Sequence, residues 1–275
     1  MYPNPRPTGE RPLTLNDFRA MHDAGEKIAC LTAYDASFAR LADAAGVEIV
    51  LVGDSLGMVI HGQGTTVGVV NADIVYHTRA VATGLSRAFL MADMPFLSFA
   101  TRDQAIRSAQ ELMQQGGAKM VKLEGGAIQA DIVEFLTSRG VPVCGHLGLQ
   151  PQLIHKLGGF KVQGREEALA AQMREDARVL EQAGADMLLI ECVPSGLARD
   201  ITSAAGVPVI GIGAGPHVDA QILVMHDILG VSRGRVPRFV KNFLSGRDDV
   251  EEAMRAYVQE VKSGAYPAPE HGFGE

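Results

Sequence analysis

Four acidic side chains stand at or near the carboxyl ends of short apolar runs, where a buried strand tolerates little charge. They are Asp54, Asp93, Glu124 and Glu191. Where parallel strands converge, such carboxylates repel one another unless a cation or protons lie between them. Oxygen donors of this kind favour Mg2+ or Mn2+ over zinc. The alternative is a set of salt bridges or helix N-caps, because buried carboxylates must be paired or bound to a metal.

Two further polar residues belong to the same strand ends. Lys122 lies two residues before Glu124, so both side chains point to one face of their strand. A lysine inside a barrel needs an anion, which is either a bound carboxylate ligand or a neighbouring acidic side chain. His146 ends the fifth run and either binds substrate or makes a structural hydrogen bond, and its role stays open.

Other candidate motifs are weaker. The glycine-rich stretch at 211–215 follows an apolar run, but Pro216 stands where a dinucleotide-binding fingerprint needs its last glycine. It is either a tight turn or a place where backbone approaches a ligand. The three cysteines, Cys30, Cys144 and Cys192, form no disulfide or zinc pattern and are expected to be packed in the core.

The runs that carry these residues are nearly continuous in apolar residues, as parallel strands buried on both faces are. They cover residues 28–35, 47–54, 89–94, 118–124, 141–148, 186–193, 207–215 and 222–229, the last of which also suits a helix. Helical patterns separate them, among them 37–45, 165–183 and a helix that Thr101 and Gln104 begin as a capping box. A helix opened by Thr14 precedes the first run, and residues 248–262 form a last helix.

This alternation predicts an α/β fold, a single-domain (β/α)8 TIM barrel with an extra N-terminal helix. The barrel spans 14–266, between tails at 1–13 and 267–275. A doubly wound open sheet is the alternative.

Composition narrows the class of protein. The 275 residues are 47% hydrophobic, and 25 basic against 32 acidic residues give a net charge of −7. The acidic balance argues against nucleic acid or an anionic membrane as partner. Residues 1–12 have no apolar segment of a signal peptide, and glycines interrupt the uncharged stretches 55–72 and 201–218. We therefore expect a cytoplasmic protein whose partners are small molecules.

Eight stretches in collinear order, between about Thr14 and Tyr266, resemble ketopantoate hydroxymethyltransferases. They are residues 31–35, 52–58, 121–126, 141–149, 160–165, 191–194, 210–215 and 221–227. The resemblance implies a (β/α)8 barrel that transfers a hydroxymethyl group from 5,10-methylenetetrahydrofolate to 3-methyl-2-oxobutanoate. The product is 2-dehydropantoate, in pantothenate biosynthesis. It also implies a homo-oligomer, a decameric ring.

The resemblance also implies roles for individual residues. It implies that Asp54, Asp93 and Glu124 surround one Mg2+ per subunit, directly or through water. Asp54 with Ser55, Asp93 and Lys122 would contact the keto acid, and Glu191 would accept its proton. The sequence departs from the family pattern at Val67–Val70 and at Pro216–His217, which puts loop closure and folate contacts in question.

Two other functions compete with this one. A Mg2+-dependent barrel lyase or mutase would act on a small 2-oxo acid without folate. A non-catalytic ligand-binding or ring-forming barrel would need none of the acidic residues at the strand ends.

Overall fold

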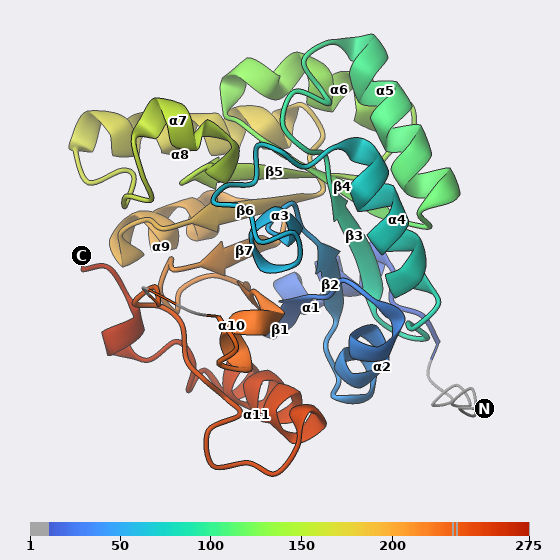
Figure 1. Cartoon of the computed structure of the whole chain (residues 1–275). Coiled ribbons are helices and arrows are strands. Elements are labelled where there is room, and N and C mark those ends of the chain that lie inside the picture. The colour runs from blue at the N-terminus through green and yellow to red at the C-terminus, as the bar shows by residue number, and fades with distance from the viewer. Residues whose placement is uncertain (1–10, 233, 235, 275) are drawn as a thin grey trace.

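Parallel strands close into a barrel in the computed structural model, which describes residues 11–232, 234 and 236–274 (Figure 1). Within these residues eight strands pair in chain order, and β8 returns to β1. The strands are β1 (Ile28–Thr32), β2 (Ile49–Val52), β3 (Phe89–Asp93), β4 (Met120–Glu124), β5 (Val143–Gly148), β6 (Met187–Glu191), β7 (Val209–Ile212) and β8 (Ala220–Leu223). The predicted (β/α)8 barrel is confirmed, and the open sheet is wrong.

Helices surround the barrel (Figure 1). They are α1 (Leu15–Asp23), α2 (Ala36–Ala44), α3 (Leu56–Val59), α4 (Asn71–Ala82), α5 (Arg102–Gln110), α6 (Ala130–Thr137), α7 (Ile154–Leu157), α8 (Glu167–Gln182), α9 (Ser195–Ala204), α10 (Met225–Ile228) and α11 (Val250–Ser263). Tighter or wider turns occupy η1 (Glu111–Gln115), η2 (Ala127–Gln129), η3 (Pro151–Leu153) and η4 (Pro269–His271). The expected helices are present, with bounds that shift by one or two residues.

Two expectations about the alternation need correction. Residues 213–219 join β7 to β8 without a helix, so one strand–helix unit is incomplete. The run at 222–229 is both a strand and a helix, because it contains the end of β8 and all of α10. A run of this length is ambiguous because apolar residues suit either element when both sides are buried.

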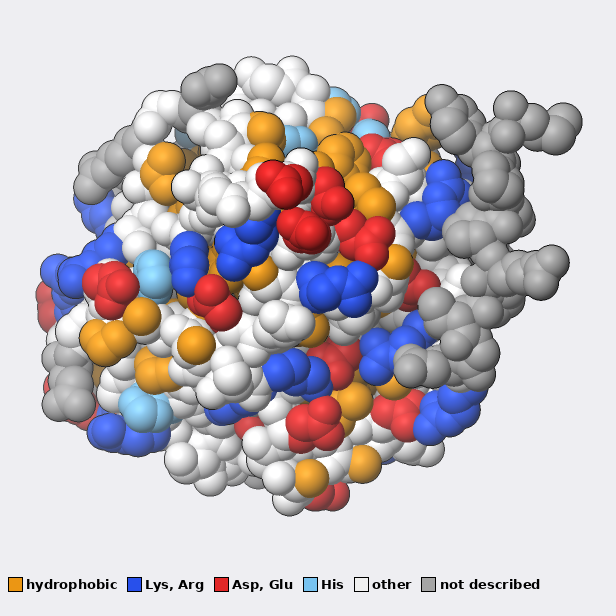
Figure 2. All heavy atoms as spheres, turned by 90° about the horizontal axis from the view of Figure 1, so that it is seen from below, with side chains coloured by type: hydrophobic (Ala, Val, Ile, Leu, Met, Phe, Trp, Pro, Cys, Tyr) orange, Lys and Arg blue, Asp and Glu red, His pale blue; other side chains and the backbone are white. Residues whose placement is uncertain are grey.

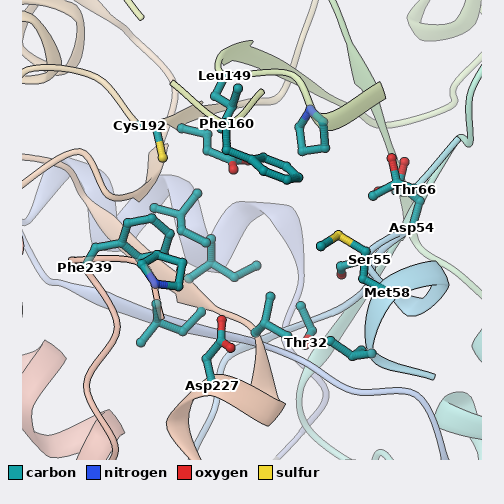
Figure 3. Close-up of a pocket in the computed structure, with 18 of the residues that line it drawn as sticks. Thr32, Asp54, Ser55, Met58, Thr66, Leu149, Phe160, Cys192, Asp227 and Phe239 are labelled. Carbon is teal, nitrogen blue, oxygen red and sulfur yellow. The ribbon is translucent and has the colours of Figure 1, made fainter. Parts of the chain in front are cut away.

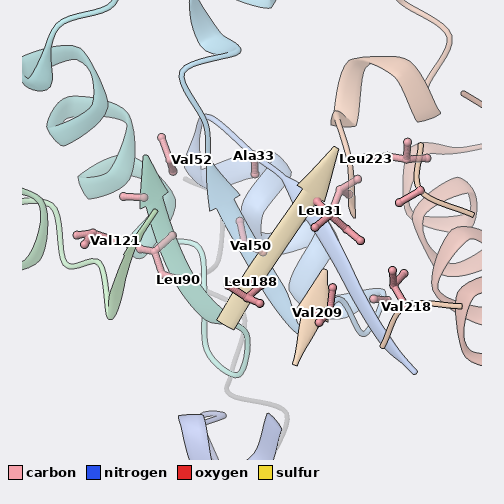
Figure 4. Packing of buried hydrophobic residues seen from close by; sticks show 14 of the residues in the cluster. Leu31, Ala33, Val50, Val52, Leu90, Val121, Leu188, Val209, Val218 and Leu223 are labelled. Atoms are coloured by element: carbon pink, nitrogen blue, oxygen red, sulfur yellow. The ribbon is translucent and has the colours of Figure 1, made fainter. Parts of the chain in front are cut away.

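The strands are apolar throughout because both of their faces are covered. Side chains such as Leu31, Val50, Leu90 and Val121 belong to the cluster that packs between the sheet and the helices (Figure 4). Alternate residues form a second cluster with α1, including Ile49, Met91 and Met187. The pleat therefore divides each strand between two cores, and the same alternation sends the polar strand residues inward.

Helix α1 belongs to this inner cluster. Its Phe18 is fully buried and meets Phe89 edge-to-face, with ring centroids 5.4 Å apart. Thr14 and Asp17 form the capping box that begins the helix. The predicted extra helix thus packs on the strand starts, which leaves the carboxyl ends open. The amino-terminal tail prediction falls mostly on residues outside the described part.

Helix α11 holds the seam where the barrel closes. The hydroxyl of its buried Tyr257 lies 2.8 Å from the carbonyl oxygen of Cys30 on β1 and 2.9 Å from that of Gln221 on β8. Lys262, at the end of the same helix, pairs with the buried Glu48 at 2.5 Å. A single helix therefore contacts both strands of the closing pair.

The surface mixes charges of both signs (Figure 2). Basic and acidic side chains are mixed over the face shown there, and several acidic ones lie together in one place. In the described part of the chain, we find no helix that combines the length and the apolar character needed to cross a membrane. The three cysteines are free and buried, as expected.

Replacing the buried hydroxyl of Tyr257 tests the role of α11. We expect Tyr257→Phe to lower the free energy of unfolding by about 1–2 kcal/mol, because the two carbonyl groups at the seam lose the one hydroxyl proton that they share. Urea denaturation followed by circular dichroism measures the change. Tyr76→Phe is the control, since the ring of Tyr76 is 62% exposed. Equal stability of the two variants would contradict the role assigned to the Tyr257 hydroxyl.

Candidate active site

One cavity of about 1070 Å3 opens at the carboxyl ends of the strands (Figure 3). Every residue predicted to act in the site lines it: Asp54, Ser55, Asp93, Lys122, Glu124 and Glu191. His146 lines it as well. Charged residues from the ends of β3, β4 and β6 and from the loop after β2 therefore face one space, as barrel geometry requires.

Asp93 and Lys122 form the central ion pair. They are partners in the register of β3 and β4, and the Nζ of Lys122 lies 2.6 Å from the Oδ1 of Asp93. The other oxygen of Asp93 accepts a hydrogen bond of 2.9 Å from the backbone N–H of Asp54. Gly53 permits this approach, because a Cβ there would stand 3.3 Å from that oxygen and 2.9 Å from the Oγ of Ser55. The loop after β2 is thereby fixed to β3.

Gln152, in the turn η3, joins two of the carboxylates and was missed by the sequence analysis. Its side-chain amide donates to the Oδ2 of Asp54 at 2.8 Å and to the carbonyl oxygen of Met94 at 3.0 Å. Its backbone N–H donates to the Oε2 of Glu124 at 3.1 Å. A lone glutamine after a proline carries no periodic signal, so only the fold brings it to this position.

Glu191 stands at the end of β6, next to His146. The Oε2 of Glu191 lies 3.2 Å from the Nε2 of His146, and the Glu191 side chain is 16% exposed. The next residue, Cys192, has a φ of 49°, a conformation that residues with a Cβ rarely adopt. Backbone hydrogen bonds to Ile212 and Gln163 hold Cys192 there. This bend ends the strand directly after the carboxylate.

Burial and mutual repulsion keep protons on these carboxylates. Burial, reinforced by Asp93, raises the pKa of Asp54 to about 7. Burial also raises the pKa of Glu124 well above its usual value, with Asp54 adding to the effect. Burial raises the pKa of Glu191 to about 8, although Lys122 opposes the shift. A carboxylate with a raised pKa near neutrality suits general acid–base chemistry.

Lys122 keeps its charge in the same surroundings. Burial alone would lower its pKa, but Asp93, Glu124 and Asp54 together raise it above the usual value. A lysine with several acidic neighbours therefore stays an ammonium, which can stabilise negative charge on a bound molecule.

Ser55 is oriented by a buried neighbour. Its Oγ lies 2.8 Å from the hydroxyl of Tyr34, which is itself almost fully buried. Ser55 precedes α3, and Figure 3 shows it beside Asp54 at the cavity wall. Both side chains predicted to contact substrate from this loop therefore face the cavity.

The outer part of the cavity has a different character. Phe160, Phe239 and Phe273 line it, and Phe160 and Phe239 approach it from different segments in Figure 3. Lys161, Arg165 and Arg238 also line the cavity. His226, on α10, lines this cavity too. The segments that carry Phe160, Lys161 and Phe239 are loops without a strand or helix pattern, so periodicity did not indicate these residues.

The chain end also reaches this region. Phe273 packs edge-to-face against Phe239, with centroids 6.3 Å apart. The backbone N–H of Ser195 donates to the carbonyl oxygen of Gly274 at 3.2 Å. The predicted limits of the carboxyl-terminal tail, 267–275, stay a prediction.

The structure shows where the glycine-rich stretch and the two segments that depart from the family pattern lie in the barrel. Gly213 and Gly215 have positive φ angles of 60° and 80°, so the stretch makes a tight turn after β7. The carbonyl oxygen of Pro216 lies 3.4 Å from the Nζ of Lys27, which precedes β1, so this departure stands at the opposite end of the barrel. The other departure, 67–70, follows the cavity residue Thr66.

The donor set fits a hard divalent cation. Asp54, Asp93 and Glu124 offer carboxylate oxygens, which Mg2+ prefers. The Oε1 of Glu124 is buried without a hydrogen bond, as an oxygen kept for a cation would be. In the described residues no three His, Cys, Asp or Glu side chains already surround a common point. Lys122 and Gln152 contact oxygens of all three carboxylates in this arrangement.

Comparison with known proteins decides the family. The model of the family described as ketopantoate hydroxymethyltransferase matches residues 12–269. The chain belongs to that family. It is 55% identical over 274 residues to a 3-methyl-2-oxobutanoate hydroxymethyltransferase of Alkalilimnicola ehrlichii, covering 100% of this chain and 99% of the relative. A protein of the same name from Methylococcus capsulatus is 57% identical over 263 residues, which are 96% of this chain and 97% of the relative.

Solved structures show the wider fold relationship of this ketopantoate hydroxymethyltransferase family member. A phosphonopyruvate hydrolase in complex with oxalate and Mg2+ has a TM-score of 0.61 at 16% identity, over 94% of this chain and 93% of that one. A 2,3-dimethylmalate lyase of the PEP mutase/isocitrate lyase superfamily has a TM-score of 0.54 at 15% identity, over 76% and 80%. At these identities the likeness shows the fold. The predicted family and enzyme class are confirmed.

The raised carboxylate pKa values make stability depend on pH. Asp54, Glu124 and Glu191 bind protons more tightly in the folded chain than in the unfolded one. Above pH of about 6.5 the carboxylates of the unfolded chain are deprotonated, and the opposing contribution of His146, whose pKa burial lowers, fades as the unfolded histidine loses its proton. We therefore expect the metal-free protein to lose about 2 kcal/mol of unfolding free energy as pH rises from about 6.5 to 8.5.

Urea denaturation with a chelator at several pH values measures this loss. The double variant Asp54→Asn, Glu191→Gln should depend less on pH over the same interval, because two of the titrating groups are gone. If the stability of the wild-type protein rose with pH over this interval, the raised pKa values of the three carboxyl groups would be contradicted.

Proposed function

We propose that this protein transfers a hydroxymethyl group from 5,10-methylenetetrahydrofolate to 3-methyl-2-oxobutanoate, giving 2-dehydropantoate for pantothenate biosynthesis. One observation carries the proposal: a carboxylate of raised pKa, Glu191, lines the same cavity as the Asp93–Lys122 pair and two further carboxylates. Proton abstraction beside a carbonyl needs a base of this kind and a cation to stabilise the enolate. The names of the close relatives fit the same reaction.

Keto-acid binding would involve the inner wall of the cavity. Asp54, Asp93 and Glu124 would hold Mg2+, which supplies Lewis-acid polarisation of the substrate carbonyl when it is bound. The ammonium of Lys122 would contact the substrate oxygen that gains charge, and the Oγ of Ser55 would donate to the same molecule. The 2.6 Å contact with Asp93 fixes the Lys122 ammonium against the strand ends.

The chain's own residues would then move the proton. Glu191, as carboxylate, takes the proton from C3 of the keto acid, and Lys122 stabilises the enolate oxygen. The enolate carbon forms a bond to the methylene carbon of the folate as the first of that carbon's two bonds to nitrogen breaks, and the proton held by Glu191 passes to the nitrogen released. Water then displaces the second folate nitrogen from the same carbon, so that its oxygen becomes the hydroxyl group of the product and one of its protons passes to that nitrogen. A Glu191 pKa of about 8 allows both directions of transfer near neutral pH.

The outer cavity suits the co-substrate. A five-carbon keto acid occupies a small part of 1070 Å3, and the remaining volume is lined by aromatic and basic side chains. A pterin ring would stack on aromatic side chains such as Phe160, and the acidic tail of a folate would meet Arg165 or Lys161. We also propose the cytoplasm as compartment, on the sequence features given above, and a homo-oligomer, a decameric ring, as assembly, on the strength of the family resemblance.

Hydrogen–deuterium exchange at C3 of 3-methyl-2-oxobutanoate tests the base. In D2O with Mg2+, we expect Glu191→Gln to lower the exchange rate by about 10²–10⁴-fold, because a glutamine cannot accept the proton. Proton NMR of the C3 signal follows the reaction, with and without folate.

Asp54→Ala should weaken Mg2+-dependent binding of the keto acid, measured by calorimetry. Glu251→Gln on α11 is the control, since it changes an acidic residue that does not line the cavity.

A normal exchange rate in the Glu191→Gln variant would contradict the role of Glu191 as the base. Exchange that yields no 2-dehydropantoate when folate is added would favour a folate-independent lyase or mutase. Absence of any exchange in folded, metal-loaded protein would favour a binding function.

Phe160 tests the co-substrate wall. We expect Phe160→Ala to raise the KM for folate about tenfold, because a stacking partner is lost, while the KM for the keto acid stays within about twofold. Steady-state kinetics with each substrate varied in turn measures both. Ile128→Ala, which truncates a side chain 84% exposed in η2, is the control. An unchanged KM for folate would contradict stacking of the pterin ring on Phe160.

A further inference from the structure

His146 stands between the lysine and the base of the proposed reaction. Its ring is 2% exposed and points inward from β5. Its Nδ1 lies 3.3 Å from the Nζ of Lys122, and its Nε2 lies 3.2 Å from the Oε2 of Glu191. The ring therefore spans the distance between two groups that the proposed reaction uses.

The lysine contact decides which ring nitrogen carries the proton. An ammonium has only donors, so the Nδ1 that faces Lys122 must accept. Burial, with Lys122 adding to it, lowers the pKa of His146 well below its usual value, so the ring is neutral and holds one proton. That proton is consequently on Nε2.

The opposite tautomer has no good partner. A proton on Nδ1 would point at the Lys122 ammonium, and the nearest carboxylate oxygen to Nδ1, the Oε1 of Glu124, is 3.7 Å away. That distance is too long for a hydrogen bond. The buried Nε2 has no completed hydrogen bond, and the Oε2 of Glu191 is the carboxylate oxygen within reach of it. The backbone of Leu149 also interacts with the ring and opposes the lowering of the His146 pKa.

We propose that His146 is a positioning residue: Lys122 fixes its Nε2–H tautomer, and this N–H holds the Oε2 of Glu191. Oxygen Oε1 of Glu191 is then left to take the substrate proton. Long or misaligned hydrogen bonds in ligand-free sites commonly shorten in the complex with substrate, so the 3.2 Å contact is a starting geometry. The proposal rests on the role given to Glu191 above.

Two substitutions separate the two ring nitrogens. In His146→Gln the amide N–H2 can reach the place of Nε2 and still donate to Glu191. In His146→Asn the shorter amide reaches only the place of Nδ1. We expect the Gln variant to keep kcat for C3 exchange within about tenfold and the Asn variant to lose about 100-fold, with KM little changed in both. Thermal denaturation checks that both variants fold.

Nitrogen-15 NMR tests the tautomer without turnover. In metal-free wild-type protein, long-range proton–nitrogen correlations should show the Nε2–H form for the ring whose signals vanish in His146→Asn. A Nδ1–H form would overturn the proposal, and so would equal loss of exchange in the folded Gln and Asn variants. If wild-type protein shows no exchange at all, the proposed function fails, and the NMR result still decides the tautomer.

Discussion

The contact between Lys122 and Asp93 is the interaction on which the rest of the site depends. Three further carboxylates, Asp54, Glu124 and Glu191, face the same cavity, and burial alone would keep protons on all of them. Lys122 lowers the proton affinity of each of these three groups, and Asp93, Glu124 and Asp54 in turn keep Lys122 charged. Removing this one cation would leave a buried acidic cluster with no compensating charge, which proteins avoid unless a metal or protons replace it.

Strand register makes that contact possible. Asp93 and Lys122 are direct partners on β3 and β4, and Glu124 and His146 are partners on β4 and β5. Because the pleat alternates, the residues two positions earlier in these strands, such as Met91 and Met120, fill the inner core. Strands β3 to β6 thus combine apolar inward residues in their first half with a polar residue at or near the carboxyl end. The amino-terminal helix α1 packs on the apolar end, and the cavity opens at the polar one.

The polar network extends beyond the residues that carry charge. Gln152 joins Asp54 to Glu124, Tyr34 meets Ser55, and His146 lies between Lys122 and Glu191. Each of these neutral groups orients a group that would contact substrate or cation. A site held this way loses little freedom when a ligand binds, which is the general condition for preorganised electrostatic stabilisation.

The sequence by itself determined the barrel and the acidic strand ends. Apolar runs of strand length between helical patterns admit few folds, and a charge such as Asp93 or Glu124 within such a run is costly enough to be informative. The tertiary structure decided what has no local signature. It placed Gln152 on two carboxylates, His146 between a lysine and a base, and Phe160 and Phe239 around the outer cavity. It also showed that a loop without a helix joins β7 to β8. These features arise from contacts between residues far apart in the chain, and no periodicity records such contacts.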